Sequence, residues 1–402
     1  MRTSLLLAVF LTPACHGPST PPSDTSTPND VSSGRDAASD AETSPDASTS
    51  TAGWLASGGL ASCASLEGRV WCWGSLPWAD WATPTEVPEL AGAQQMSLGA
   101  LHACALFPSG EVMCGGSSRS GRLGMDTPIA PALFVRVVGV HDAVDLSVGD
   151  AAACVVQRGG QVLCWGDNAI GQTGRAFPAH APGLPVPQPT PAPVEGLSGA
   201  VSVGAAGNHA CALLSGGSVA CWGHDAFGAL GRGARYTGGS EFMPQPVEGL
   251  SEVTQLAITG QGGCAMRVDG SIGCWGGSVS HYPGFEAMVA DNCPVVVDQS
   301  CWRAPRALVG VAGATELQMS AGSGCTKTAG QWQCWGRDDY GQTLGDGRPL
   351  GSLAQVSLGA GHLCVRAADG AVSCRGAGER GQLGDGLSMN SRTFVRPALP
   401  TR

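Results

Sequence analysis

From about Gly53 onward the chain alternates short apolar segments with glycine-rich turns, and the same pair of segments recurs. One clear copy reads Asn208-His209-Ala210-Cys211 and, after a turn, Val219-Ala220-Cys221-Trp222-Gly223. Short apolar runs bounded by glycine predict two antiparallel strands joined by a tight turn. Two cysteines mark each hairpin: Cys63 and Cys72, Cys104 and Cys114, Cys154 and Cys164, Cys211 and Cys221, Cys264 and Cys274, Cys325 and Cys334, and Cys364 and Cys374. This recurrence at about 50 residues predicts an all-β protein built from seven repeats.

The length of each turn changes together with the spacing of its cysteines. Where the cysteines are ten apart, a three-residue turn ends in glycine, as in Ser215-Gly216-Gly217. Where they are nine apart, the turn has two residues, as in Glu67-Gly68. Both arrangements place the two cysteines opposite each other in a non-hydrogen-bonded pair, about 4.5 Å apart at Cα. We therefore expect one intra-hairpin disulfide in each repeat.

Free thiols and metal ligands are the alternatives to these disulfides. Zinc sites prefer cysteines two to four residues apart, and that spacing does not occur in the sequence. An eighth pair, Cys293 and Cys301, lies in an insertion, and we expect it to bridge that loop. Disulfides in this number indicate an oxidising compartment.

The first 15 residues are typical of an export signal. Arg2 precedes the apolar run Leu5 to Leu11, which is too short to span a membrane, and Ala14-Cys15 follows. This layout resembles a bacterial lipoprotein signal, which implies that Cys15 becomes the lipidated first residue, although Thr12 stands where such signals usually have leucine. Ordinary secretion is the alternative. Without Cys15, the 17 cysteines become an even set, which favours lipidation.

Residues 16–52 contain Ser, Thr or Pro at 20 of 37 positions, with Val31 as the one large aliphatic residue. Such a segment cannot offset its chain entropy by burial, so we expect a disordered tether. The predicted organisation is a signal peptide over 1–15, a tether over 16–52 and the repeat domain over 53–402.

The charge of the chain argues against nucleic acid as a partner. Asp and Glu number 32 against 22 Lys and Arg, a formal net charge of −10, and Lys327 is the only lysine. Nucleic-acid binding needs clustered basic residues that neutralise phosphates. The sequence also lacks the H-E-x-x-H, G-x-S-x-G and phosphate-loop motifs of common enzyme classes. We therefore expect neither an enzyme nor a cofactor.

Variants of three motifs follow one another along the repeats: G-x-x-H-x-C, G-x-V-x-C-W-G and a turn such as Gly381-Gln382-Leu383-Gly384. In this order they resemble the repeats of the regulator of chromosome condensation family. The resemblance covers about residues 53–402 and implies a seven-bladed β-propeller. The first unit lacks the last turn, and no Pro-x-x-Val strand stands between Gly347 and Val356. We expect the C-terminal segment Phe394–Pro397 to close the ring by supplying a strand missing before Gly53.

Two sets of repeated side chains allow a functional or a structural interpretation. His102, His209 and His362 share one repeat position, where a metal ring is conceivable, but they fall in separated units with small residues between. We favour packed or backbone-bonded histidines and expect no metal. The tryptophans after the second cysteine could form an aromatic ring, but regular repeat positions favour a role in packing one blade onto the next.

Aromatic residues at irregular positions are different, because they gather in the connectors after the second cysteine of each unit. They are Trp78, Trp81, Phe177, Tyr236, Tyr282, Phe285, Trp302 and Tyr340. Insertions at one repeat position fall on one face of the disc, so we expect a shared partner-binding face there. Scattered surface aromatics are the alternative.

These features favour a monomeric binding scaffold, lipid-anchored at the periplasmic or outer surface of a bacterial envelope, whose partner is a protein or glycan. An enzyme inhibitor that resembles the propeller β-lactamase inhibitory protein is the alternative. Guanine-nucleotide exchange, the activity of the family's founding member, is less favoured because export separates the chain from cytosolic GTPases. A hydrolase site in the central funnel also stays open.

Overall fold

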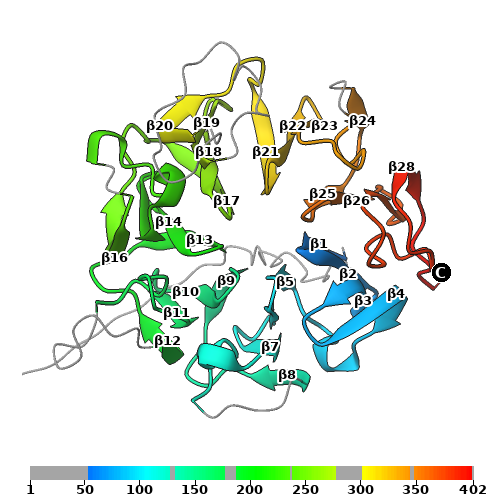
Figure 1. Cartoon of the computed structure of the whole chain (residues 1–402), viewed down its shortest axis with the longest axis horizontal. Coiled ribbons are helices and arrows are strands. Elements are labelled where there is room, and N and C mark those ends of the chain that lie inside the picture. Colours follow the sequence, from blue (N-terminus) through cyan, green and yellow to red (C-terminus); the bar gives the residue numbers. More distant parts are fainter. Residues whose placement is uncertain are drawn as a thin grey trace, which may run out of the picture. The chain divides into compact units, whose positions relative to one another are not determined.

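The computed structural model describes residues 53–126, 132–176, 187–235, 238–277, 301–344 and 348–400. These described residues form seven four-stranded antiparallel sheets arranged as blades around an axis (Figure 1). Each blade is continuous in sequence and runs from the axis outward. The predicted all-β, seven-bladed propeller is therefore confirmed.

The four strands of a blade occupy equivalent places in each repeat. The innermost strands are β1 (Leu55–Gly58), β5 (Gln95–Leu98), β9 (Ala143–Val148), β13 (Ala200–Ala206), β17 (Val253–Thr259), β21 (Ala314–Ser320) and β25 (Gln355–Leu358). The second strands are β2 (Leu60–Leu66), β6 (His102–Leu106), β10 (Ala152–Gln157), β14 (His209–Leu214), β18 (Gly262–Arg267), β22 (Ser323–Thr328) and β26 (His362–Arg366).

The third and fourth strands complete each blade. The third strands are β3 (Arg69–Leu76), β7 (Val112–Gly116), β11 (Val162–Gly166), β15 (Val219–His224), β19 (Ile272–Gly277), β23 (Gln331–Gly336) and β27 (Val372–Gly376). The outermost strands are β4 (Ala79–Glu86), β8 (Ala132–Arg136), β12 (Gln188–Pro193), β16 (Ser240–Pro246), β20 (Cys301–Ala307), β24 (Pro349–Gly351) and β28 (Ser391–Val395). Short 3₁₀ turns lie in some connections: η1 (Pro88–Leu90), η2 (Arg119–Gly121), η3 (Ala226–Gly228) and η4 (Gly233–Arg235).

Each of the seven predicted hairpin disulfides is present and links the second and third strands of its blade. The bridges join Cys63 to Cys72, Cys104 to Cys114, Cys154 to Cys164, Cys211 to Cys221, Cys264 to Cys274, Cys325 to Cys334, and Cys364 to Cys374. The two cysteines of each bridge stand directly opposite each other in the strand register. Their Cα atoms are 4.0–4.1 Å apart. This separation is shorter than the value of about 4.5 Å expected for a non-hydrogen-bonded pair, but the predicted pairing holds in every blade.

The turns of these hairpins have the predicted backbone conformations. The glycine that ends each three-residue turn has a positive φ, such as 74° at Gly217. In the two-residue turn of the first blade, Glu67 and Gly68 both have positive φ, as a type I′ turn requires. Of the eighth predicted pair, the structure describes one cysteine. Cys301 is disulfide-bonded, whereas its predicted partner Cys293 lies outside the described residues.

The C-terminal segment does not close the ring by completing the first blade, so that expectation was wrong. Strand β28 pairs with β27 as the outer strand of the seventh blade, and β1 to β4 supply the first blade entirely. Side chains join the two blades instead. Gln355 both accepts from the Leu55 N–H and donates to its carbonyl at 2.8 Å, and Ser357 Oγ accepts from the Ser57 N–H at 2.7 Å. The absence of a Pro-x-x-Val strand before Val356 suggested a short outer strand in the seventh blade, but the short strand, β24 with three residues, belongs to the sixth.

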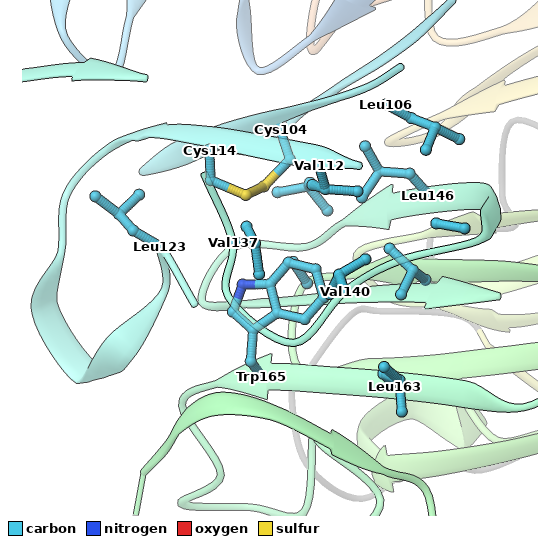
Figure 2. Packing of buried hydrophobic residues seen from close by; sticks show 14 residues of the cluster. Cys104, Leu106, Val112, Cys114, Leu123, Val137, Val140, Leu146, Leu163 and Trp165 are labelled. Carbon is cyan, nitrogen blue, oxygen red and sulfur yellow. A yellow bond between two sulfur atoms is a disulfide. The ribbon is translucent and has the colours of Figure 1, made fainter. Parts of the chain in front are cut away.

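Tryptophan side chains join neighbouring blades, which confirms the predicted core role for four of the five; Trp335 is half-buried against the core of the fifth and sixth blades. Four of them donate Nε1–H at 2.8–3.0 Å to a carbonyl in the Gly-x-x-Gly turn of the preceding blade. The pairs are Trp73 with Gln382, Trp165 with Arg122, Trp222 with Gln172 and Trp275 with Ala229. Figure 2 shows Trp165 among side chains of the second and third blades, beside the Cys104–Cys114 bridge.

The two repeats without this tryptophan are explained by their neighbours. The second blade has Gly115 at that position, and the first blade, which precedes it, lacks the turn that would accept the hydrogen bond. The Phe134 ring lies against Gly115 instead. In the seventh blade the buried Arg375 takes the place of tryptophan, and its Nε donates to the Gly341 carbonyl of the sixth-blade turn.

Candidate binding face and axial cavity

The meander topology gives the propeller two different faces. The turns from first to second strand and the connectors from third to fourth strand share one face, which we call the connector face. The cysteine hairpin turns and the blade-to-blade connections share the other, which we call the hairpin face. Chain direction places Gly53, just before β1, at the hairpin face.

Four of the predicted partner-binding aromatics lie in the described residues, and their environments differ. Trp78 and Trp81 are half-buried and pack on the core of the first two blades. The Trp78 ring meets Phe134 edge to face, with centroids 4.8 Å apart. Tyr340 is 42% exposed on the connector face and lies against Gly361 of the seventh blade.

Trp302 corrects the prediction. Its side chain is 0% exposed, in strand β20, where it packs with Leu308 and Leu317. A partner cannot reach it, because this tryptophan fills the core between the fifth and sixth blades. The other predicted members, Phe177, Tyr236, Tyr282 and Phe285, lie outside the described residues.

Several exposed apolar side chains on the connector face escaped the sequence prediction. Leu60 is 42% exposed and Leu101 45%, at equivalent positions three residues before the first cysteine of the repeat. Other repeats have small or polar residues there: Ala151, Asn208, Gln261, Gly322 and Gly361. Leu387 and Met389, in the connector of the seventh blade, are 57% and 67% exposed. Alignment of the repeats at this position would have revealed the two leucines.

The hairpin face also exposes large apolar residues, but they are of one kind. They are Val138, Val144, Val201, Val268 and Val309. Single exposed valines are normal on a protein surface. Tyrosine and methionine, in contrast, are enriched at interfaces, and both occur on the connector face of the sixth and seventh blades.

A cavity of about 600 Å³ lies on the propeller axis and is lined by residues from all seven blades. Its walls come from the innermost strands and from the turns that follow them at the connector face. A second cavity, of about 400 Å³, is lined by the beginnings of β1, β5 and β25 and is rich in glutamine and serine. Volumes of several hundred Å³ are typical of ligand sites.

Side-chain hydrogen bonds fix the wall of the axial cavity. The Asp145 carboxylate accepts from Gln95 Nε2 at 3.0 Å and from Ser202 Oγ and the Val203 N–H at 2.9 Å. Gln255 joins the fifth blade to the sixth, because its side chain both accepts from and donates to the backbone of Leu317 at 2.9 Å. These side-chain hydrogen bonds thus join innermost strands of neighbouring blades along the wall of the cavity.

Asp150 is the second carboxylate of the axial cavity and is in a different situation. No hydrogen bond or ion pair to its side chain occurs among the described residues. The side chain is open to solvent, yet the surrounding protein displaces part of its hydration, which raises the pKa of the carboxyl above its ordinary value. This carboxylate is therefore available to a ligand.

The three repeated histidines lie at three different blade boundaries and are at most 3% exposed. His362 Nε2 is 2.8 Å from Ser62 Oγ of the first blade, and His209 lies near the backbone of Gly262 in the fifth. They therefore pack against neighbouring blades. Within the described residues, no group of three metal-ligating side chains comes together.

Burial of these histidines makes the stability of the propeller depend on pH. Desolvation lowers the pKa of His102 to about 3 and those of His209 and His362 to about 4. Because the unfolded chain takes up these protons below about pH 6.5, the stabilisation is complete above that pH and is lost as the pH falls toward 4. Denaturant unfolding at several pH values between 6.5 and 4 gives the free energy of unfolding as a function of pH. This free energy should fall less steeply with decreasing pH for His362→Gln than for the native protein. The exposed His141→Gln serves as control, and equal slopes for all three proteins would contradict the assignment.

None of the helices in the described part of the chain has the length and apolar character needed to cross a bilayer.

Comparison with known proteins gives a result at the level of fold. No family model matches the sequence, and a search of curated proteins finds no significant match. Among solved structures, human WBSCR16 superposes with a TM-score of 0.68 at 18% identity, over 83% of this chain and 94% of that one. Prp20p of Saccharomyces cerevisiae, whose structure was reported with its binding to Gsp1p and histones, gives 0.66 at 20% identity, over 83% and 87%. The chain therefore has the fold of the RCC1-like seven-bladed β-propellers.

Proposed function

We propose that this chain is an exported binding scaffold, lipid-anchored through Cys15 to a bacterial envelope, that holds a protein partner on its connector face. The observation that carries the proposal is the set of exposed side chains on that face: Leu60, Leu101, Tyr340, Leu387 and Met389. They follow one another around the ring from the sixth blade to the second. A tyrosine, a methionine and leucines suit a protein surface better than a glycan, which stacks on exposed aromatic rings.

The hairpin disulfides support export, because such bridges persist in oxidising compartments. The direction of the chain supports the choice of face. Gly53, the first described residue, lies at the hairpin face, so the N-terminal junction of the propeller does not occupy the connector face. We therefore propose binding at the connector face and do not transfer the partners named for Prp20p, because a structural likeness at 20% sequence identity shows the fold alone.

The test compares partner capture by matched variants of the two faces. Tyr340→Ala, Leu101→Ala and Met389→Ala remove apolar surface from the connector face, and each should weaken capture from an envelope extract. Truncation of a central interface residue costs about 2 kcal/mol or more. Val138→Ala, Val268→Ala and Val309→Ala make a similar change on the hairpin face and should leave capture unchanged.

Melting curves establish that each variant is folded, and quantitative mass spectrometry identifies the protein whose recovery changes. One tight partner, lost only with the connector-face variants, would favour an enzyme inhibitor; several weaker partners would favour a general scaffold. Loss of capture with the valine variants alone would show that the proposal has chosen the wrong face.

A further inference from the structure

The mouth of the axial cavity at the connector face is bordered by one equivalent residue from each blade. This residue stands four positions before the first cysteine of its repeat, and all seven line the cavity. In chain order they are Gly59, Ala100, Asp150, Gly207, Gly260, Ala321 and Ala360. Six of the seven are glycine or alanine. A single carboxylate thus interrupts a ring of small residues at the opening of the cavity.

The charge of Asp150 has no counter-ion in the cavity. The charged residues that line the cavity are Asp145 and Asp150, and no lysine, arginine or histidine lines it within the described residues. Asp145 is already satisfied by hydrogen bonds from Gln95, Ser202 and Val203. A partly desolvated carboxylate without a partner is stabilised when a cation pairs with it. The cavity is therefore electrostatically complementary to a positive group.

We propose that the axial cavity receives one basic side chain of the partner protein, with its ammonium or guanidinium group paired with Asp150. The inference rests on the proposed function and specifies how the connector face recognises its partner. The rim supports a protein as the source of the cation, because Leu60 and Leu101 directly follow the rim residues Gly59 and Ala100 and are exposed beside the opening. One free carboxylate matches one monovalent group, which favours a single side chain over a polyamine.

The geometry fits a side chain better than a bare ion. The cavity of about 600 Å³ is much larger than one cation, and the small rim residues leave its mouth open. The stem of lysine or arginine can lie along the wall while its charged end reaches the carboxylate, in the way that these residues bury their methylene groups. A loop that projects such a residue would also place its neighbours on Leu60, Leu101 and Tyr340.

The test uses Nα-acetyl-lysine N-methylamide as the probe and the full oxidised chain as the receptor. Calorimetry should detect binding in the millimolar range, in which the stem of the probe and the ion pair both contribute, and Asp150→Asn should weaken it about tenfold or more. Asp142→Asn is the matched control, since it removes the same charge on the hairpin face at a residue whose φ of 55° asparagine accepts. Its affinity for the probe should equal that of the native protein.

A second probe and a second variant separate the charge from the stem of the probe and from the fold of the receptor. The Nε-acetylated form of the probe has the same stem without the charge and should not bind. Asp150→Ala restores the residue type of the other blades, so it keeps the fold if Asp150→Asn does not, and it should also lose the probe. Binding that survives both Asp150 changes, equal binding of the acetylated probe, or no binding to the native protein would overturn the inference.

These outcomes are separable from those of the proposed function. If the lysine probe fails while the connector-face variants still lose the partner, the scaffold proposal stands and only the cation site is wrong. If the probe binds through Asp150 while partner capture is indifferent to the connector-face variants, the cavity is a cation site and the proposed interface is wrong. A stronger response to spermidine than to the lysine probe would identify a polyamine site and contradict the choice of a side chain.

Discussion

Replacement of both Cys211 and Cys221 by alanine should lower the free energy of unfolding by about 2–3 kcal/mol, the chain-entropy contribution of a bridge that closes a loop of this length. The two cysteines are fully buried between strands β14 and β15. Alanine leaves no unpaired thiol, so the loss reports on the bridge and on a small packing defect. Denaturant unfolding of the oxidised protein measures it, with Ser215→Ala at the tip of the same hairpin as control.

The effect should multiply when all bridges are absent. Seven contributions of this size approach or exceed the total stability of about 5–15 kcal/mol that is usual for a folded domain. We therefore expect chain made under reducing conditions not to reach the propeller fold, as judged by near-ultraviolet circular dichroism and protease resistance. A reduced propeller that melts within a few degrees of the oxidised one would show that blade packing alone sustains the fold.

The hairpins could be predicted because their information is local. Cysteine spacing, turn length and a terminal glycine all lie within about ten residues, and together they fix one register. The dipeptide Trp-Gly is also a local signal, because the third strand has a bulge at this point. Gly223, for example, has a φ of 100° and lies close to the His209 backbone. A side chain at that glycine would collide with the neighbouring strand.

The failed predictions depend on contacts between distant parts of the chain. Strand β1 has only four residues, Leu-Ala-Ser-Gly, with a weak strand pattern, and its hydrogen bonds to Gln355 and Ser357 come from 300 residues away. The sequence therefore suggested a missing strand before Gly53 and assigned the C-terminal strand to fill it. Trp302 was misplaced for a similar reason, because it belongs to an outer strand rather than to the connector that precedes it.

The axial cavity could not be found in any single repeat. Its lining consists of the innermost strands, which come together only when the ring closes, and its rim residues are glycines and alanines that carry no local signal. Asp150 becomes informative only when the seven equivalent positions are compared around one opening. The seven equivalent positions can be read from the sequence, but the structure is needed to show that they border the cavity.

Replacement of Trp222 by alanine should lower the free energy of unfolding by about 3–5 kcal/mol, as for other buried tryptophans. The side chain is 0% exposed, packs in the core between the third and fourth blades, and donates to the Gln172 carbonyl at 3.0 Å. Alanine removes both the packing and the hydrogen bond, so the turn of the third blade that contains Gln172 loses its contact with the fourth blade.

A conservative variant separates the two contributions. Trp222→Phe keeps much of the apolar volume but leaves the buried Gln172 carbonyl without its donor, which costs about 1–3 kcal/mol in addition to the lost packing. The half-buried Trp71→Phe, in the first blade, should change stability by less, within about 0.5–1 kcal/mol. Denaturant unfolding of the three oxidised variants gives these differences directly. If Trp222→Phe costs no more than Trp71→Phe, the hydrogen bond to the preceding turn does not stabilise the ring, and apolar contact alone joins the blades.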